Sequence, residues 1–320
     1  MKFTRRIALL PAVAVLLAAC SGGSPSPSGG TESMAESMAP ESMAESMAPS
    51  AAANDYLARI MDAGVIVVST DPEYPPQSYL DADSGDFMGF DIDVATEIAK
   101  RLGVDVQFET PSWDAITAGH WSGRWDMSVG SMTITQDRKA VIDFTQPYYY
   151  TPAQMATYTD SGITSLADLA NKTVCAGSST TYLDWLDGNL TLTEEAGDVA
   201  TPPDGVQSTS FETDINCADA WRSGRHDFEG WLSSSTTVAG AIAADYPVVT
   251  VGDPVFYEPL AVAFDNSVDD NDSLVAAVDD IIGQMHDDGT LSELSKKWFC
   301  ADGSYPCENP DQDGLDLTTR

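Results

Sequence analysis

The chain alternates short apolar, β-branched runs with amphipathic helical stretches from about residue 56 onward, and this alternation restricts its fold more than any other feature. Residues 65–68 read Val-Ile-Val-Val, as in a buried parallel strand, and residues 91–102 predict a helix capped by Asp91. A strand is expected at 104–108. The other expected elements are a strand through Val174, helices near 181–187 and 214–223, a strand at 247–251, a helix at 273–286 and a last helix that opens with a capping box at Thr290 and ends near Trp298. This pattern predicts an α/β protein with mostly parallel sheets, and its two sets of elements predict two lobes.

The first residues are typical of an export signal. Residues 1–19 combine a basic start with an apolar stretch that is too short to span a bilayer. The stretch ends in Leu-Ala-Ala-Cys20, which resembles a bacterial lipobox and implies cleavage before Cys20 and a lipid on its sulfur. The alternative is an ordinary cleavage site followed by a chance cysteine. Residues 20–54 are rich in Ser, Gly and Pro and repeat one nine-residue motif at 32–40 and 41–49, which predicts a flexible linker.

Cysteine usage and charge narrow the function. Once Cys20 is assigned to the lipid, Cys175, Cys217, Cys300 and Cys307 remain, and in an oxidising compartment they allow three pairings. Closeness in sequence favours Cys300–Cys307, which leaves Cys175–Cys217. A four-cysteine zinc site is the alternative, but no C-x-x-C spacing supports it. Fifty acidic against fifteen basic residues give a net charge of −35, which argues against a nucleic-acid binder.

A series of motifs adds a family resemblance. In order they are Asp71-Pro-Glu-Tyr-Pro-Pro, Gly89-Phe-Asp-Ile-Asp93, Trp113-Asp-Ala-Ile, Asp126, Ser131-Met-Thr-Ile-Thr-Gln-Asp-Arg138 and Phe144-Thr-Gln-Pro-Tyr148. This set resembles the extracellular polar-amino-acid-binding proteins of ABC importers (family 3). The resemblance covers about residues 60–300.

The resemblance implies a two-lobed α/β fold of the type II periplasmic-binding-protein class, with a ligand held in the cleft and two crossover hinge strands. We place the hinge strands near 154–160 and 252–260. The implied boundaries are 55–156 plus 258–300 for lobe 1, 157–254 for lobe 2, and 301–320 for a C-terminal tail that contains a disulfide loop. Cys175 and Cys217 also stand where some glutamate-receptor relatives have a cysteine pair.

The segment from Ser131 to Arg138 is the strongest candidate for an anion site. A strand ends here and a helix is expected to begin, so free backbone N–H groups and the positive end of the helix would favour a carboxylate. Arg138 adds a planar fork that matches two carboxylate oxygens. The resemblance assigns carboxylate binding to Arg138 and Thr133 and ligand-amine contacts to Ser131. Thr181, at a helix start in lobe 2, would reach the same carboxylate when the lobes close. A surface Arg138 paired with a neighbouring Asp is the alternative.

The ligand's other groups have several candidate partners. Asp71, Tyr74 and Trp113 align with family positions that hold the ligand side chain, and the two rings can sandwich a flat or cationic group. A core role is the alternative for both rings. The family usually supplies a lobe 2 Asp for the α-ammonium, but the counted position here is Leu232, or Ser234 after an insertion. Glu229 could substitute, or Trp231 could complete an aromatic cage for a methylated or cyclic ammonium.

These observations predict an extracytoplasmic solute-binding receptor, anchored to the membrane by its lipid, that delivers an amino acid or related zwitterion (a polar amine) to the permease subunits of an ABC importer. We expect a monomer without cofactor, metal site or catalytic residues. A same-fold periplasmic enzyme of the dehydratase type and a ligand-sensing ectodomain are the alternatives. The enzyme would use Glu229 or Asp71 as a general acid, but no nucleophile–base pair or phosphate loop is present.

Overall fold

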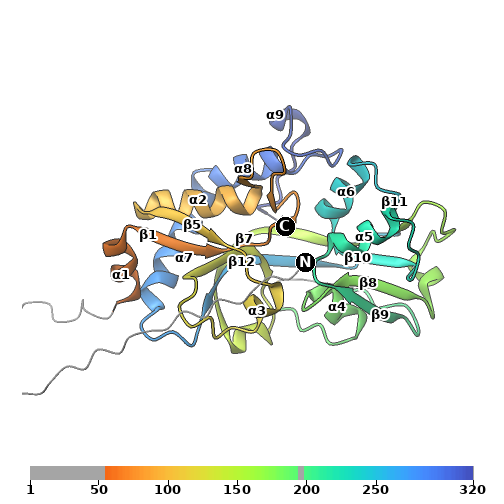
Figure 1. Ribbon diagram of the computed structural model, residues 1–320, viewed down its shortest axis with the longest axis horizontal. Coiled ribbons are helices and arrows are strands. Elements are labelled where there is room, and N and C mark those ends of the chain that lie inside the picture. The colour runs from red at the N-terminus through yellow and green to blue at the C-terminus, as the bar shows by residue number, and fades with distance from the viewer. Residues whose placement is uncertain (1–54, 194–197, 320) are drawn as a thin grey trace, which may run out of the picture. The chain divides into compact units, whose positions relative to one another are not determined.

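One sheet of nine strands organises the part of the chain that the computed structural model describes, residues 55–193 and 198–319. The strand order is β5-β1-β6-β12-β7-β10-β8-β9, and β11 pairs with β7. The signal peptide, Cys20 and the linker expected from the sequence lie outside the described residues. Two long strands at the centre of the order, β7 (Ile142–Tyr158) and β12 (Phe256–Asp265), separate the sheet into two halves, each with its own helices (Figure 1).

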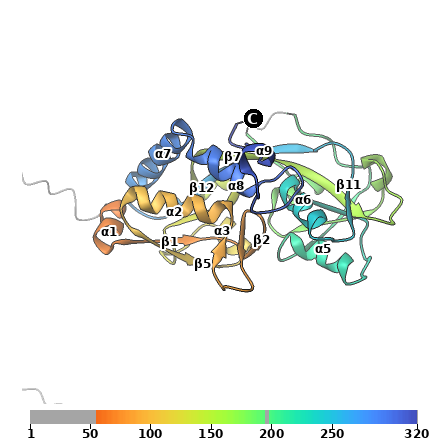
Figure 2. The same ribbon diagram turned by 90° about the horizontal axis from the view of Figure 1, so that it is seen from above.

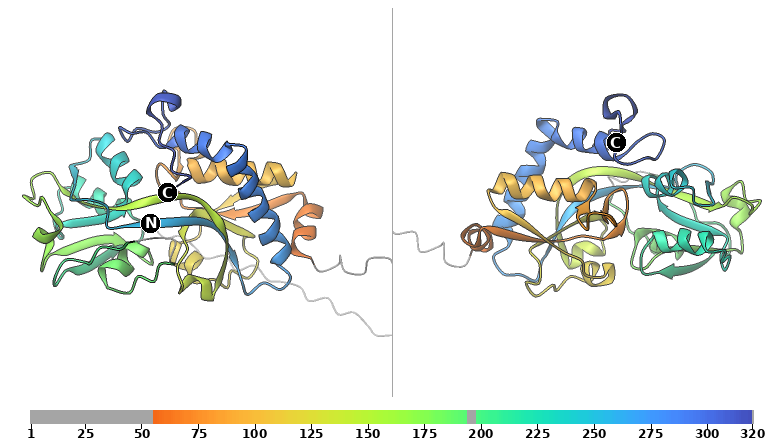
Figure 3. Two further views of the ribbon diagram at one scale, coloured as in Figure 1. Left: turned by 180° about the vertical axis from the view of Figure 1, so that it is seen from behind. Right: turned by 45° about the horizontal axis from the view of Figure 1, so that its top comes forward.

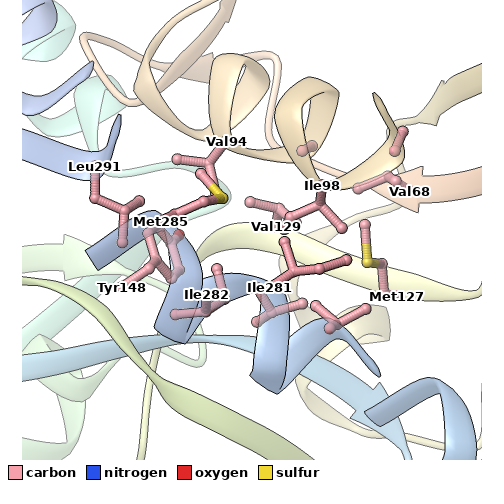
Figure 4. Packing of buried hydrophobic residues seen from close by; sticks show 14 of the residues in the cluster. Val68, Val94, Ile98, Met127, Val129, Tyr148, Ile281, Ile282, Met285 and Leu291 are labelled. Carbon is pink, nitrogen blue, oxygen red and sulfur yellow. The ribbon is translucent and has the colours of Figure 1, made fainter. Parts of the chain in front are cut away.

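Lobe 1 is the half of the sheet that begins with parallel strands. Its strands in the main sheet are β1 (Val65–Ser69), β5 (Asp105–Glu109) and β6 (Met127–Thr133). Its helices are α1 (Tyr56–Ala63), α2 (Phe90–Leu102), α3 (Trp113–Thr117), α7 (Asp272–Asp287) and α8 (Thr290–Trp298). A separate small antiparallel sheet consists of β2 (Glu73–Tyr74), β3 (Ser78–Leu80) and β4 (Phe87–Met88). Figure 4 shows how α2 and α7 bury their apolar faces against the strands: Val94, Ile98, Ile281 and Ile282 meet Val129. Burial of these side chains is the main stabilising contribution to lobe 1.

Lobe 2 has two cores, one on each face of its sheet. Its elements are β8 (Thr173–Gly177), β9 (Gln207–Phe211), β10 (Gly230–Ser234), β11 (Val248–Thr250), α4 (Thr181–Leu186), α5 (Ile215–Arg222), α6 (Ser235–Ala243) and a 3-10 turn at Leu166–Leu169. Neighbouring residues of β10 point to opposite faces, so Leu232 packs with α4 and Trp231 with α5 and α6. Helices therefore cover both faces of this half of the sheet; Figure 2 shows α5 and α6, which lie together on one of them.

The two lobes are joined by a ribbon of β7 and β12. These strands pair antiparallel from Phe256 opposite Ala153 to Asp265 opposite Ile142. At one end β12 also pairs with β6 of lobe 1, and at the other end β7 also pairs with β10 of lobe 2. The left view in Figure 3 shows both strands running side by side from one lobe into the other. The ribbon corresponds to the two crossover strands that the resemblance implies.

Two details of the helices differ from the sequence prediction. The N-cap residue of α2 is Gly89, and Asp91 lies buried in the first turn, where it accepts hydrogen bonds from Tyr148 and Ser131. The expected cap role of Asp91 is therefore wrong. The capping box at Thr290 is also absent: the N-cap of α8 is Gly289, in the left-handed region at φ 82°, and the Thr290 hydroxyl donates to Asp288. Gly suits that backbone conformation better than Thr.

The C-terminal segment, residues 300–319, crosses the junction between the lobes. Both disulfides expected from the sequence are present, Cys175–Cys217 within lobe 2 and Cys300–Cys307 within this segment. The carbonyl of Leu317 accepts a hydrogen bond from the backbone N–H of Tyr150 on β7. Tyr305 contacts Tyr79 of lobe 1 and lies against Gly240 on α6 of lobe 2. No helix among the described residues is long and apolar enough to span a membrane.

Candidate functional site in the cleft between the lobes

A small cleft, partly open to solvent, lies between the two lobes. It is lined by Asp71, Tyr74, Trp113, Gly130, Ser131, Thr133 and Arg138 from lobe 1, by Gly177, Thr180, Thr181, Tyr182, Glu212, Thr213 and Asp214 from lobe 2, and by Glu258 from the ribbon. The carboxyl ends of β6, β8 and β9 open toward it, as expected for a ligand site in an open α/β sheet. Seven of the nine ligand-binding residues predicted from the sequence line this cleft.

The turn after β8 closes directly onto lobe 1. The Ser179 carbonyl accepts hydrogen bonds from Arg138 Nη2 (2.9 Å) and from Trp113 Nε1 (3.1 Å). The Ser178 hydroxyl donates to Asp114 Oδ1 at 2.9 Å. Ser179 has a left-handed backbone, φ 54°, which is uncommon for a residue with a side chain. Three hydrogen bonds across the cleft therefore hold the lobes in the closed arrangement.

Arg138 is buried, and its surroundings differ from the predicted anion site. The expected helix is only a 3-10 turn of three residues, Arg138–Ala140. Its backbone N–H groups are already bonded: Gln136 N donates to Thr191 O and Arg138 N to the Thr135 hydroxyl. The prediction of free N–H groups at a helix start is therefore wrong. The Arg138 guanidinium itself is in the cleft, where Nη1 donates to the Thr133 carbonyl at 3.1 Å and the group lies 5.6 Å from the centre of the Trp113 ring.

Glu258 is a buried carboxylate at the base of the cleft, with 1% of its surface exposed. Its Oε1 accepts hydrogen bonds from the hydroxyls of Thr133 (2.6 Å) and Thr181, and its Oε2 accepts one from Tyr182 (2.6 Å). Burial raises the pKa of Glu258, while these hydroxyls and the Arg138 charge act in the opposite direction. Thr133 and Thr181 thus meet across the cleft, as expected, but at a carboxylate of the protein.

Two further carboxylates line the walls of the cleft. Asp214, at the N-cap position of α5, accepts a hydrogen bond from Gly177 N at 2.8 Å, and burial raises its pKa to about 7. Asp71 accepts from Glu73 N at 2.8 Å, and burial raises its pKa to about 6. A raised pKa means that burial disfavours the ionised form of the carboxyl group. A nearby cation would stabilise that ionised form.

Ser131 and Tyr74 line the cleft but are engaged by neighbouring groups. The Ser131 hydroxyl donates to Asp91 Oδ2 (2.8 Å) and contacts the Tyr149 hydroxyl (2.6 Å). Burial also raises the pKa of Asp91 to about 7. The Tyr74 hydroxyl lies 3.2 Å from that of Tyr182 in lobe 2, so the Tyr74 side chain also takes part in closure. The Ser131 hydroxyl is thus already hydrogen-bonded within the protein. Its predicted contact with a ligand amine stays a prediction.

Glu229 and Trp231 lie outside the cleft lining, contrary to their predicted place in the site. Glu229 is partly exposed, and its Oε2 accepts a hydrogen bond from Thr173 N. Trp231 is fully buried in the core formed with α5 and α6. All five residues of β10 are buried and helices cover both of its faces, so sequence alternation alone could not reveal which face looks toward the site. Ser234, the position counted from the family Asp, is the N-cap of α6 and accepts a hydrogen bond from the Gln77 side chain.

The sequence analysis missed eight residues of the cleft lining, of which Asp214, Glu258 and Tyr182 carry the polar groups described above. A lobe 2 Asp is therefore available after all, at the end of β9 rather than on β10. Glu258 had a recognisable signal, since it is the one charged residue in the apolar run from Val255 to Phe264. A charge is rarely kept in such a run unless it is paired. Among the described residues, no group of three or more His, Cys, Asp or Glu side chains could hold a metal ion.

The raised pKa values predict that acidification stabilises the fold. Asp71, Asp91 and Asp214 have folded-state pKa values of about 6, 7 and 7, against 3.8 for an ordinary Asp. At pH values between 3.8 and these folded-state pKa values, the folded state binds more protons than the unfolded state. Proton binding by these three groups therefore stabilises the fold fully below the unfolded pKa, and this stabilisation is lost as the pH rises through the folded-state values. We expect the free energy of unfolding to increase from pH 8 to pH 5 by on the order of 1–3 kcal/mol per group, measured by urea denaturation.

Asp214→Asn provides the matched test, because Asn copies the protonated carboxyl. We expect this variant to be more stable than the wild type at pH 8 and about equal to it at pH 5. Asp311→Asn, at an exposed position in the short helix α9 (Pro310–Asp313), is the control and should follow the wild type. An unchanged pH profile in Asp214→Asn would contradict the assignment.

Comparisons with known proteins agree with this architecture. An ancestral amino-acid-binding protein, titled a precursor of cyclohexadienyl dehydratase, is 30% identical, with a TM-score of 0.64 over 76% of this chain and 99% of that chain. An ancestral arginine-binding protein bound to arginine is 28% identical, with a TM-score of 0.63 over 74% of this chain and 98% of that chain. These likenesses confirm the predicted two-lobed periplasmic-binding-protein fold of type II.

Sequence relatives point the same way. The L-cystine-binding protein TcyJ of Escherichia coli K12 is 29% identical over 249 residues, which cover 77% of this chain and 86% of TcyJ. The arginine-binding extracellular protein ArtP of Bacillus subtilis is 26% identical over 73% of this chain and 86% of ArtP. Both of these relatives are named as amino-acid-binding proteins. The model of the bacterial extracellular solute-binding proteins, family 3, matches residues 66–301, and the chain therefore belongs to that family of extracytoplasmic solute-binding proteins.

Proposed function

We propose that this protein is the receptor of an ABC importer for an amino acid or a related polar amine, which it captures between its two lobes. The main support for this proposal is the cleft itself. Polar and charged side chains of both lobes converge there, and three hydrogen bonds join the lobes beside it. A ligand that contacts both walls binds the closed state better than the open state, and this difference in affinity drives closure. The relatives named for cystine and arginine support the substrate class.

Each wall of the cleft has a proposed role. Asp71 and Asp214 are the acceptors for ligand cations, since both are carboxylates whose charge burial disfavours. Arg138 fixes the closed state through Ser179 and supplies the one positive charge of the lining. Tyr74 and Trp113 provide ring surface against the ligand's carbon chain. The cage of three rings considered from the sequence is reduced to these two, because Trp231 lies in a core.

We further propose that the protein is held at the outer face of the cell membrane by a lipid on Cys20, with residues 20–54 as the spacer to the folded lobes and the permease subunits of the importer as its partner. The lipobox-like sequence supports the anchor. Mass spectrometry of the N-terminal peptide from the membrane fraction should find a diacylglyceryl group on Cys20. An unmodified Cys20 thiol in the mature protein would contradict the anchor but leave the receptor function intact.

A thermal-shift screen tests the receptor function. Twenty amino acids, their decarboxylated amines, cystine, betaines and ectoines form the panel. A ligand present at a hundred times its Kd adds about 2.7 kcal/mol to the free energy of unfolding and so raises the melting temperature by several degrees. We expect a saturable shift with at least one amino acid or amine, confirmed by calorimetry with one ligand per chain. If no member of either class binds, the proposed function is wrong.

A further inference from the structure

A second set of hydrogen bonds joins the two lobes away from the cleft lining. Gln77 lies in the turn between β2 and β3 of lobe 1, and its side chain reaches the start of α6 in lobe 2. Its Nε2 donates to Ser234 Oγ at 3.0 Å and to Thr236 Oγ1 at 2.8 Å. The Thr237 hydroxyl donates in return to Gln77 Oε1 at 3.4 Å. Both N–H groups of the amide therefore have an acceptor on the opposite lobe.

The backbone of lobe 1 holds this glutamine in place. Its carbonyl accepts a hydrogen bond from Asp91 N at 2.8 Å, and the carbonyl of Pro76 accepts one from Phe90 N at 3.2 Å. Both donors belong to the first turn of α2, so the turn before β3 is fixed on the start of that helix. A side chain at Gly89 would collide with the Gln77 carbonyl, which explains the glycine at the N-cap of α2. The side chain of Gln77 thus extends to lobe 2 from a fixed base.

The bridge is buried and lies outside the reach of a ligand. Gln77 and Ser234 are fully buried, and Thr237 and Thr236 are 1% and 8% exposed. None of these four residues belongs to the cleft lining, so a bound solute neither makes nor replaces their hydrogen bonds. When the lobes separate, water has to take over the bonds of the amide, and the net difference in free energy favours the closed state. That contribution is the same for every ligand.

The position of Ser234 shows what the bridge replaces. Ser234 is the N-cap of α6 and one of the two counted positions at which the family resemblance leads us to expect an Asp for the ligand's α-ammonium. Here a neutral hydroxyl stands at that position, and the N–H group that it accepts comes from Gln77 of lobe 1. The amide of the protein thus makes a contact with the start of α6 that the resemblance assigns to the ligand.

We infer that Gln77 is a positioning residue for closure of the lobes: its amide bonds lobe 1 to the start of α6 and so favours the closed cleft independently of the ligand. A larger closed fraction raises the apparent affinity, because a ligand that needs the closed state loses less free energy in reaching it. The inference concerns the closing movement and goes beyond the proposed function, since it holds whichever amino acid or amine the receptor carries.

The distance between two spin labels, measured by double electron–electron resonance, tests the inference without any ligand. The labels are placed at Ala118→Cys in lobe 1 and Asn189→Cys in lobe 2, both exposed positions, in a mature chain that carries Cys20→Ser. Unfolding in guanidinium with the disulfides intact, followed by refolding, removes any solute carried through purification. We expect a closed component in the wild type. Gln77→Ala should lower the ratio of closed to open molecules about tenfold or more, as the loss of two amide hydrogen bonds implies.

Three further variants separate closure from a structural role in lobe 1. Gln77→Met keeps the length of the side chain without the amide, and Thr236→Val removes an acceptor in lobe 2; both should lower the ratio, which covers the case in which Gln77→Ala fails to fold. Thr236→Val should have little further effect once Gln77 is alanine, because the two side chains share one bond. Gln107→Ala, at an exposed position on β5, is the matched control and should leave the ratio unchanged.

A reduced closed fraction in these variants, with coupling between Gln77 and Thr236, would support the inference. The same label distances in the wild type, Gln77→Met and Thr236→Val would overturn it, and so would effects of Gln77→Ala and Thr236→Val that simply add. Either of those results would leave the receptor function standing, because the thermal-shift screen tests that function separately.

Discussion

Arg138→Ala is expected to abolish useful ligand binding while the fold survives. The substitution removes the hydrogen bond from Arg138 to the Ser179 carbonyl and with it the main charged link between the lobes. It also removes the positive charge that acts to lower the pKa of the buried Glu258. If the ligand's carboxylate pairs with Arg138, as the family resemblance implies, loss of one member of that buried pair costs about 2–5 kcal/mol, which corresponds to roughly two to four decades in Kd.

Titration calorimetry with the ligand found in the screen measures this loss, and circular dichroism confirms the fold. Arg138→Lys keeps the charge but lacks the second nitrogen, so its affinity should lie between those of the wild type and the alanine variant. Arg225→Ala, which removes an exposed lobe 2 cation paired with Asp227, is the control and should bind normally. A change of less than about threefold in Arg138→Ala would exclude Arg138 from the site.

Removal of the Cys175–Cys217 disulfide should cost the fold more than any other change considered for lobe 2. The bond spans 42 residues and joins β8 to α5 inside a core where both cysteines are fully buried. The chain-entropy relation gives about 4 kcal/mol for a loop of this length and about 2.5 kcal/mol for the seven-residue separation of Cys300–Cys307. Urea denaturation of the two double alanine variants should reproduce this order.

The same pair of variants separates stability from binding. Asp214 is the N-cap residue of α5, the helix that Cys217 anchors to β8. Loss of Cys175–Cys217 should therefore also lower the affinity for the ligand, whereas loss of Cys300–Cys307 should not. Equal losses of stability in the two double variants would contradict the loop-length argument. A Cys175 fragment joined to Cys300 or Cys307 in non-reducing peptide maps would refute the pairing itself.

Much of the fold could be predicted because its elements have strong local signals. Helix α7 was expected at 273–286 and runs from Asp272 to Asp287, since Leu274, Val278, Ile281 and Met285 recur at helical spacing and all face the core. The short strands β2, β3 and β4 were not predicted, because strands of two or three residues leave no readable periodicity. Their pairing depends on contacts between distant segments.

The site was predictable only in part, for a physical reason. Arg138, Thr133 and Thr181 are brought together as expected, because each follows the end of a strand or begins a helix at the same edge of the sheet. The partner they share, Glu258, lies on the ribbon, more than seventy residues beyond Thr181 in sequence. Sequence spacing within one motif cannot reveal which buried acid returns to it through the tertiary fold. The same applies to Asp214 and Gly177.

The paired ribbon of β7 and β12 limits how the lobes can move. Two strands that are hydrogen-bonded along their length can bend and twist together, but they resist sliding past each other, because that movement breaks the ladder. The C-terminal segment, bonded to β7 through Leu317 and Tyr150, adds a third tie on the same junction. The lobes are thus free to bend and twist about the ribbon but not to slide along it. A junction that keeps its strand register brings Arg138 back to the same level as the Ser179 carbonyl each time the cleft closes, so recognition depends on the backbone as well as on the side chains that meet there.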